Sequence, residues 1–285
     1  MAAVNTNIGA SIAQNALSKN ERSLNTAVER LSTGKRINGA KDDAAGLAIS
    51  SRMTSQIRGL AAGMKNANDA ISMISVADGA MVEIGNMLQR MRELALQSSN
   101  GTTTSADRDY LDAEYSNLIT EIERVAQNTQ WNGSDILNVA NNSLKYQVGA
   151  NGGQTIAVDF GAVDQTNGSA FGAFAAGASA VSIAAGTAAS AITAGTEAIT
   201  KVDAAITELN DNRATFGAAI NQLTYAIDNL SSVKVNSEAA RSRIEDTDYA
   251  KETSELARSA IIHQAGLSML AQANQVTATV LALLR

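Results

Sequence analysis

Apolar residues at alternating spacings of four and three constrain the fold of this chain more than any other feature of its sequence. One such run covers residues 202–230, another covers residues 53–95, and a shorter one covers residues 111–125. This spacing puts apolar side chains on one face of a helix and is typical of helices that pack side by side. Because no single stripe can bury itself, the runs predict a mainly α-helical fold, a long antiparallel helical bundle or coiled coil.

The residues that we expect in the core of this bundle come from these runs. Charged residues also occupy positions in the runs, namely Arg213 in the first and Asp78 and Arg92 in the second. Aromatic residues are only 4% of the chain and proline is absent, so the core depends on aliphatic side chains and no proline interrupts a long helix. The predicted core residues are Ile57, Leu60, Ile71, Ile74, Leu118, Ile122, Phe216, Ile220, Leu223 and Ile227.

Polar and glycine-rich stretches mark where the predicted helices end. The stretch 99–105 separates the second run from the third, and Ser105 is a candidate N-cap for the helix that follows. We expect that helix to end at Asn-Gly-Ser, residues 132–134. Alternating apolar residues then flank a glycine-rich turn at residues 149–153, which predicts a small β-hairpin within residues 144–160.

Residues 161–196 differ in composition from the rest of the chain. They are mostly glycine, alanine, serine and threonine, with scattered valine, isoleucine and phenylalanine. Because such a segment cannot bury a large core, we interpret it as a small surface excursion or a loosely ordered insert. We expect the next helix to begin near Glu197.

The two ends of the chain form a further matched pair of helices. Leucines stand seven residues apart in the first segment, whereas the last segment keeps the alternating spacing and adds apolar residues such as Ile261 and Ile262. A two-stranded coiled coil would leave this surplus in water, which predicts a surface for other subunits. The residues that we expect in this pairing and assembly are Leu17, Leu24, Leu31, Leu267, Leu270, Leu281 and Leu284.

The composition excludes several kinds of chemistry. Without cysteine and with one histidine, the chain has no disulfide, thiol nucleophile or histidine cluster, and neither glycine-rich turn has P-loop spacing. A net charge of −6 gives no general electrostatic reason to bind nucleic acid. We therefore expect no enzyme, no cofactor and no metal. The N-terminus lacks the pattern of a cleaved secretory signal. The sequence has no continuous apolar stretch of about 18 residues, so we expect no membrane insertion.

Several motifs carry a resemblance to a known family. Residues 31–49 read LSTGKRINGAKDDAAGLAI, and together with residues 88–98 and 129–133 they resemble the N-terminal signature of bacterial flagellins. Residues 242–250 and 264–275 resemble the C-terminal signature of the same family. The motifs are long and stand in the family's order at both ends of the chain.

The resemblance implies a subunit built in layers. Residues 1–44 and 243–285 would be the two halves of an inner coiled-coil layer. Residues 45–160 and 197–242 would form a rod-like helical layer that includes the β-hairpin. Residues 161–196 would be a short variable outer insert.

The densest acidic groups would lie where these layers connect. They are the pair Asp42-Asp43 and the cluster Glu245, Asp246 and Asp248. A metal or acid–base site would need such groups to converge. We interpret them instead as a polar connector that pairs with nearby basic residues, and we interpret His263 as a packed histidine of the last helix. The candidate basic partners are Arg30, Lys35, Arg36 and Lys41.

The resemblance also implies a structural function, self-assembly into the helical, tubular filament of the bacterial flagellum for motility. Such a subunit would be exported unfolded by the flagellar type III system, without a cleaved signal peptide, and polymerised at the distal tip outside the cell. The implied partners are further copies or sister flagellins, the export apparatus, a flagellin-specific chaperone, the filament cap and hook–filament junction proteins.

A further implied partner is the innate immune receptor Toll-like receptor 5, acting on the monomer. In flagellins that this receptor recognises, the matching positions are Arg90, Leu94 and Glu114. We interpret them as an arginine, an apolar contact and an acid on one exposed face. Packing between subunits of the filament is the competing interpretation of the same residues.

Two alternatives to a filament subunit stay open at this point. A hook–filament junction protein would share the terminal helices without polymerising indefinitely. A surface-exposed binding module would present residues 161–196 to a ligand, although that segment lacks clusters of aromatic or charged residues.

Overall fold

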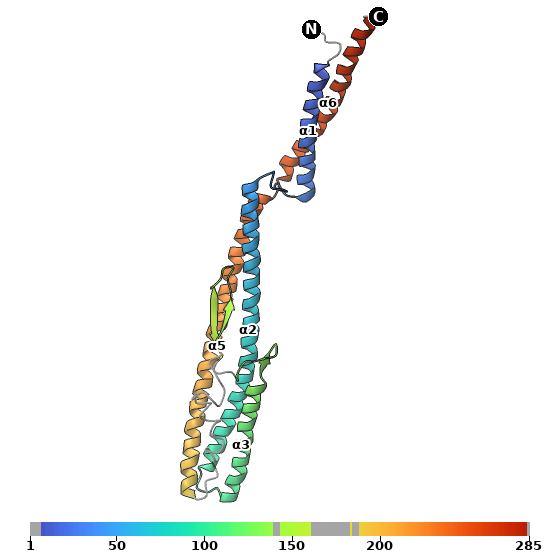
Figure 1. Cartoon of the computed structure of the whole chain (residues 1–285). Helices are drawn as coiled ribbons and strands as arrows, with labels where there is room; N and C mark the ends of the chain where they lie inside the picture. Colours follow the sequence, from blue (N-terminus) through green and yellow to red (C-terminus); the bar gives the residue numbers. More distant parts are fainter. Residues whose placement is uncertain (1–6, 139–142, 161–182, 184–187, 284–285) are drawn as a thin grey trace. The chain divides into compact units, whose positions relative to one another are not determined.

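The chain is mainly α-helical, as the apolar spacing predicts (Figure 1). The structure is a computed structural model, and it describes residues 7–138, 143–160, 183 and 188–283. Its helices are α1 (Ile8–Thr33), α2 (Ala44–Ser98), α3 (Ser105–Asn128), α5 (Ala188–Glu245) and α6 (Tyr249–Leu283). Its strands are β1 (Gln130–Trp131), β2 (Ser134–Asp135), β3 (Ser143–Gln147) and β4 (Thr155–Asp159).

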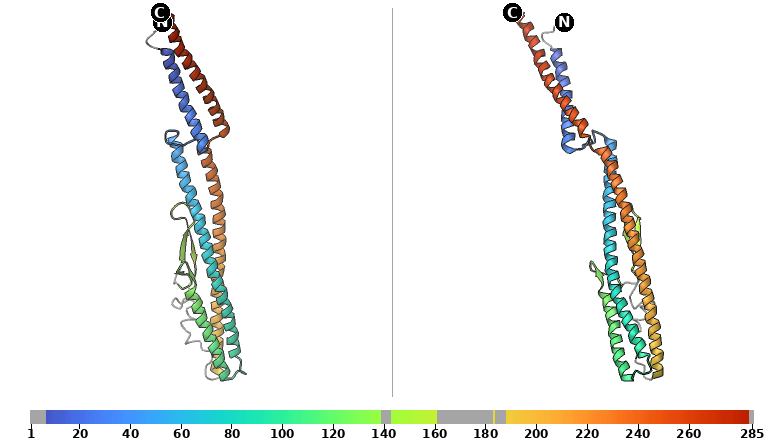
Figure 2. Two further views of the ribbon diagram at one scale, coloured as in Figure 1. Left: turned by 90° about the vertical axis from the view of Figure 1, so that its right-hand side faces the viewer. Right: turned by 180° about the vertical axis from the view of Figure 1, so that it is seen from behind.

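The chain folds into two compact units. Unit 1 consists of residues 1–57 and 235–285, and unit 2 consists of residues 58–234. Helices α2 and α5 therefore contribute residues to both units. In unit 1, α1 and α6 lie side by side in all three views (Figures 1 and 2).

Unit 2 is a bundle of α2, α3 and α5 around a continuous apolar core. Fully buried side chains come from each helix, for example Leu88 of α2, Tyr115 of α3 and Phe216 of α5. The core also takes in Phe160, which follows β4 and packs on Phe216 with ring centroids 5.5 Å apart. The residue that follows the β3–β4 hairpin thus shares one core with the three helices.

The residues that the apolar spacing predicts for the core lie at the inward side of these helices. Six are buried, namely Leu60, Ile74, Ile122, Phe216 and Leu223 in unit 2 and Ile57 in unit 1. Four are partly buried and pack against the apolar core of unit 2, namely Ile71, Leu118, Ile220 and Ile227. Helix α2 is long and apolar enough to cross a membrane, but core helices of soluble proteins also meet these criteria of length and composition. In unit 2 the inward side of α2 forms part of the protein core.

The N-cap of α3 is Thr104, so the prediction of Ser105 is wrong by one residue. The Thr104 side chain accepts the backbone N–H of Asp107, and the Asp107 carboxylate accepts the N–H of Thr104 in return. This reciprocal pair is a capping box, which needs an acidic or amide side chain three residues after the cap. Hydrogen bonds from Thr104 lower the pKa of Asp107 below its ordinary value.

Helix α3 ends at Asn128, before the predicted stop at residues 132–134. Asn132 and Gly133 instead form the two-residue turn between β1 and β2, with φ angles of 50° and 80°. An Asn-Gly pair favours this turn because both central residues need positive φ. The dipeptide was therefore a hairpin signal rather than a helix stop.

The predicted β-hairpin is confirmed. Strands β3 and β4 are antiparallel, with Ser143 opposite Asp159 and Gln147 opposite Thr155. The hairpin approaches α2 closely, since an added Cβ at Gly63 would lie 2.6 Å from the carbonyl oxygen of Val148. The Asn66 amide also donates to the carbonyl of Gln147 over 3.0 Å.

Helix α5 begins at Ala188, so the predicted start near Glu197 is wrong. Alanine is the strongest helix former, and the alanine-rich sequence from residue 188 onward continues the helix toward its N-terminus. Most of the predicted insert, residues 161–182 and 184–187, lies outside the described residues. Ile183 is described, and it is fully buried in the core of unit 2.

Candidate assembly surfaces

Side-chain hydrogen bonds to the backbone join α1 and α6 in unit 1. The Asn20 amide donates to the carbonyl oxygen of Ser259 over 2.7 Å, and the Asn7 amide donates to that of Ala273 over 3.0 Å. Leu17 packs close to Gly266, where an added Cβ would lie 3.1 Å from its Cδ1. These contacts run in opposite sequence directions and therefore define an antiparallel pair.

The leucines predicted for this pair are only partly shielded. Leu17, Leu24, Leu31 and Leu270 are half-buried. Leu267 stays 42% exposed. Leu284 lies outside the described residues, and the side chain of Leu281 is likewise not described. The α1/α6 pair thus shields its seam leucines without enclosing them.

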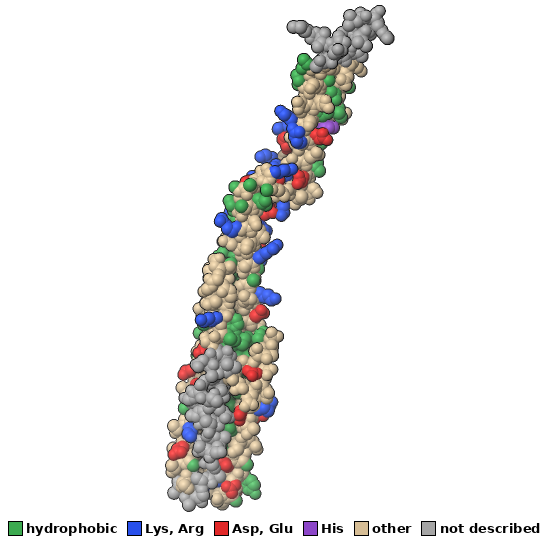
Figure 3. All heavy atoms as spheres, viewed as in Figure 1, with side chains coloured by type: hydrophobic (Ala, Val, Ile, Leu, Met, Phe, Trp, Pro, Cys, Tyr) green, Lys and Arg blue, Asp and Glu red, His purple; other side chains and the backbone are tan. Residues whose placement is uncertain are grey.

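Large apolar side chains lie open on the same two helices. The most exposed is Ile261, at 70%, followed by Ile12 at 66% and Met269 at 64%. Figure 3 shows hydrophobic side chains at the surface of this pair, among polar ones. We call these exposed residues the terminal apolar set: Ile8, Ile12, Val28, Ile261, Ile262, Leu267 and Met269.

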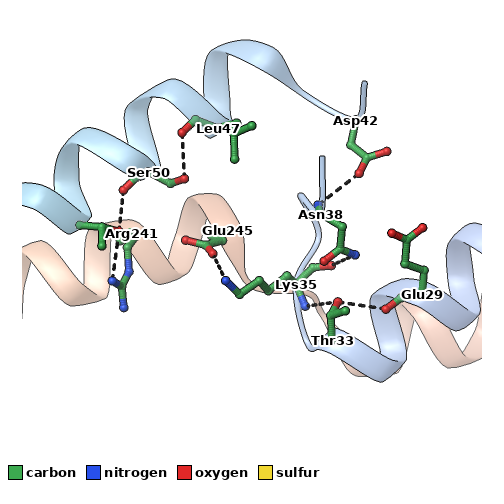
Figure 4. Close-up of polar contacts among 10 residues, drawn as sticks. Glu29, Thr33, Lys35, Asn38, Asp42, Leu47, Ser50, Arg241 and Glu245 are labelled. Carbon is green, nitrogen blue, oxygen red and sulfur yellow. Dashed lines mark hydrogen bonds and ion pairs between the residues drawn. The ribbon is translucent and has the colours of Figure 1, made fainter. Parts of the chain in front are cut away.

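The polar connector of unit 1 joins the end of α1 to the turn between α5 and α6 (Figure 4). Lys35 forms an ion pair with Glu245, with Nζ 2.5 Å from Oε1. The guanidinium of Arg36 donates to the carbonyl oxygen of Ile244 over 2.6 Å, near the C-terminal end of α5. The N–H of Thr247 donates to the carbonyl of Gly34. Side chains and backbone together therefore close the connector.

The acidic residues of the connector act as turn and cap residues. Asp42 accepts the N–H groups of Asn38 and Gly39, each over 3.1 Å. Asp43 accepts the N–H of Gly46 in the first turn of α2. Asp248 does the same for residues 250 and 251 at the start of α6.

The basic residues predicted as partners of this connector divide between two roles. Lys35 pairs with Glu245 of the predicted cluster, whereas Arg30 lies 3.6 Å from Glu252, one turn into α6. Arg36 binds a carbonyl oxygen rather than a carboxylate. Within the described residues, no three His, Asp or Glu side chains come together in a way that could hold a metal ion. The connector therefore has the geometry of a structural joint.

Arg90 and Glu114 meet across α2 and α3 of unit 2. The Arg90 guanidinium donates from Nε to Glu114 Oε1 over 2.9 Å, and its Nη1 lies 3.1 Å from Glu93. Both side chains of the pair are about half exposed, at 50% and 46%. The hydrogen bond to Glu114, and then that to Glu93, raises the pKa of Arg90.

Leu94 does not share that exposed face, which corrects the interpretation of Leu94 as a surface contact. Its side chain is fully buried, like Leu88 and Met91 on the same helix. A position four residues after Arg90 lies about one turn further along α2 and about 40° further round it, and there Leu94 belongs to the buried core stripe. His263 is partly exposed on α6.

Comparison with known proteins identifies the family at both ends of the chain. Residues 4–142 match the bacterial flagellin N-terminal helical region, and residues 199–284 match the bacterial flagellin C-terminal helical region. A flagellin of Xenorhabdus nematophila is 42% identical over 99% of both chains. The flagellar filament 33 kDa core protein of Treponema phagedenis is 38% identical, again over 99% of both chains.

A solved structure extends the comparison to the fold. The structure of a putative flagellar hook-associated protein from Vibrio parahaemolyticus has a TM-score of 0.55 and 14% identity. The match covers 72% of this chain and 100% of that one, and it shows a shared fold alone. Taken with the family matches at both ends, the antiparallel terminal helices and the helical bundle show that this chain belongs to the bacterial flagellin family, a family of filament-forming structural proteins and not of enzymes.

Proposed function

We propose that this chain polymerises into the flagellar filament through the terminal apolar set, after export in a largely unfolded form and addition at the distal tip. The observation that carries the proposal is the exposure of large apolar side chains on both α1 and α6. Burying such surface between subunits is the main favourable contribution to protein association. A contact between different surfaces of successive copies produces a helical polymer when the rotation between copies does not close into a ring.

The proposal assigns the parts of the chain to layers of that polymer. Residues 1–44 and 243–285 are the inner layer, and residues 45–160 with 188–242 are the rod-like layer, since α5 begins at Ala188. The assignment is supported by unit 1, which gathers both ends of the chain into one compact body and carries the terminal apolar set.

Export and growth at the tip imply further partners. We propose the flagellar export apparatus, a flagellin-specific chaperone, the filament cap and hook–filament junction proteins, together with other copies of the chain or sister flagellins. Before assembly the terminal apolar set is unshielded, so a chaperone that covers it would suppress premature association. Because its helices make many local contacts, the chain is suited to rapid refolding after export.

The experiment that tests polymerisation targets the exposed isoleucines of α6. Purified monomer of the variant Ile261→Gln/Ile262→Gln is mixed with short filament seeds and ammonium sulfate, and growth is measured by electron microscopy. We expect long tubes from the parent chain and none from the variant. The matched control, Gln272→Ala/Gln275→Ala, changes two exposed polar residues of the same helix and should polymerise.

Two outcomes would contradict the proposal. Normal filament length from the isoleucine variant would show that the terminal apolar set is not an assembly surface. If the correctly folded parent chain formed only short pieces that stop growing, a junction protein would be favoured over a filament subunit.

A second candidate function, recognition of the monomer by Toll-like receptor 5, is supported by the half-exposed ion pair between Arg90 and Glu114. We expect Arg90→Ala to weaken receptor signalling by purified monomer. Arg124→Ala is the control, because Arg124 is an exposed arginine paired with Glu121 elsewhere in unit 2. Equal signalling from both variants would remove Arg90 from the recognition site. Leu94→Ala tests the core instead, since Leu94 is buried.

A further inference from the structure

Three positions on α2, each seven residues apart, break the apolar stripe that faces α5. They are Asp78, Gly85 and Arg92. Apolar residues occupy the equivalent positions earlier on the same helix, including Met64 and Ile71. An acid, a residue without a side chain and a base therefore follow one another along one line of the helix.

Each of these three positions meets a complementary residue of α5. The Arg213 guanidinium donates to Asp78 with Nε 2.8 Å from Oδ1. Arg92 donates to Asp203 with Nε 2.7 Å from Oδ1 and Nη2 3.5 Å from Oδ2.

Between the two ion pairs, Gly85 makes room for Leu209. A Cβ added at Gly85 would lie 3.0 Å from Leu209 Cδ2, tighter than an ordinary van der Waals contact. The order on α2 is thus acid, space and base, and the order along the facing line of α5 is base, leucine and acid. We call these six residues the register set: Asp78, Gly85, Arg92, Asp203, Leu209 and Arg213.

The two ion pairs contribute little to stability. Their side chains are between 38% and 48% exposed, so solvent screens the attraction between the charges. The register set should affect the choice between alternative pairings of α2 and α5 more than it affects stability. A wrong pairing removes favourable contacts and adds unfavourable ones at the same positions.

The apolar runs on α2 and α5 do not by themselves choose one pairing. Both repeat after seven residues, so a displacement of α5 by seven residues again brings apolar faces together. In the displaced pairing, Ile206 or Ile220 would face Asp78. The backbone at Gly85 would face Val202 or Phe216 in place of Leu209.

We infer that the register set fixes the register of α5 on α2, acting as positioning residues for the fold of unit 2. A polar residue at a seam position is a known means of selecting register in coiled coils, where a mismatched partner leaves it unpaired. In this chain the selection is made twice by charge and once by volume. The inference concerns unit 2 alone and does not depend on assembly into a filament.

The absence of cysteine from the chain allows register to be read directly by engineered disulfides. Ser99→Cys/Gly195→Cys reports the register of the structure, because an added Cβ at Gly195 lies 3.2 Å from the Cβ of Ser99. This separation is near the range in which a disulfide forms. Ser99→Cys/Val202→Cys reports a displacement of α5 by seven residues. Each full-length reporter is unfolded in urea, refolded, oxidised and mapped by mass spectrometry.

The first comparison replaces one ion pair by leucines, Asp78→Leu/Arg213→Leu, in both reporters. We expect the displaced cross-link to rise at least about tenfold over the parent, a fold-change equal to about 1.4 kcal/mol of register preference. The midpoint of thermal unfolding should change little, because a partly exposed ion pair contributes little to stability. If the ion pair only stabilised the fold, its replacement by leucines would lower the midpoint of thermal unfolding without raising the yield of the displaced cross-link.

The second comparison reverses charge in the reporter of the native register. Asp78→Arg alone places two arginines together and should reduce the yield of the cross-link between positions 99 and 195. The double exchange Asp78→Arg/Arg213→Asp should restore that yield. The inference is overturned if the leucine variant gives no more displaced cross-link than the parent, or if the double exchange fails to restore what the single change loses.

Discussion

Unit 2 encloses an unbroken apolar core between three helices and a hairpin, whereas the described part of unit 1 buries only Ala27, Ile37 and Ile57 among its apolar residues. Yet both units derive from the same kind of sequence, helices with apolar residues at alternating spacings. The units differ in the number of helices whose apolar stripes pack against one another. Three helices can enclose a core, but two helices leave one side of each stripe in water.

This comparison shows how one chain combines a self-sufficient body with an incomplete one. The side chains of a single chain are enough to enclose the apolar core of unit 2. Unit 1 keeps Ile261, Ile12 and Met269 open to solvent, at 64–70% exposure. A unit in this condition gains most from partners, which is the physical basis of the proposed assembly.

Removal of residues 243–285 should give the largest effect. We expect no filaments at all from this truncated chain, because it lacks α6 and with it more than half of the terminal apolar set. The cooperative thermal transition of unit 2, followed by circular dichroism, should persist, since no residue of unit 2 is removed. Loss of that transition would show that unit 2 depends on unit 1.

Truncation of one core side chain in each unit should give the next largest difference. Phe216 is fully buried in unit 2, so Phe216→Ala should lower the free energy of unfolding by about 3–5 kcal/mol. Leu24 is only half-buried in unit 1, so Leu24→Ala should cost well under half of that in the monomer. Urea unfolding of the two variants measures both values. Equal costs would contradict the contrast between the units.

Two glycines of α2 should respond to alanine with opposite signs. Gly63→Ala places a Cβ 2.6 Å from the Val148 carbonyl oxygen, so it should destabilise the docked hairpin by about 1–3 kcal/mol. Gly79→Ala meets nothing within 4 Å and should stabilise the helix by about 0.5–1 kcal/mol. Thermal unfolding midpoints of the two variants test this. A stabilising effect at both positions would mean that the hairpin does not rest closely on α2.

The N-cap of α3 should give a smaller loss of stability than the docked hairpin. Thr104→Ala should lower the free energy of unfolding by about 1 kcal/mol, because it leaves an N–H of the first turn without its acceptor.

The variant Asp107→Asn should be less stable than the parent at neutral pH. Since the folded-state pKa of Asp107 is lowered, its carboxylate stabilises the fold above its unfolded pKa, and this contribution is lost as the pH falls through the folded value. Thermal unfolding across acidic pH should show the two proteins converging, and a constant difference would contradict this role.

Several features of the fold follow from the sequence because they depend on local chemistry. The alternating spacing indicates the helices, and the glycine-rich turn at residues 149–153 indicates the hairpin of β3 and β4. Local signals also explain the errors at the boundaries. Thr104 with Asp107 is a capping box, and Asn132-Gly133 is a two-residue turn, and both patterns were present in the sequence.

Other features come from partners far apart in the chain, so no local pattern indicates them. Ile183 belongs to a segment of low complexity, yet its backbone N–H donates to Asp112 over 2.8 Å and its carbonyl accepts from Ser98 over 2.6 Å. Arg108 is buried and donates to the carbonyl of Ser98 at the end of α2. Its charge gives no sign of that burial in the sequence.

The sequence by itself determined that the chain is mainly helical, which faces of the long helices are apolar and which family the chain resembles. These properties depend on spacing along one helix and on motifs that are continuous in the chain. Only the tertiary structure decided that Leu94 faces inward, that Arg36 binds a carbonyl and that Asp78 meets Arg213. A stripe that repeats every seven residues fits its partner in more than one register, and the register is settled only when specific side chains on two helices come into contact.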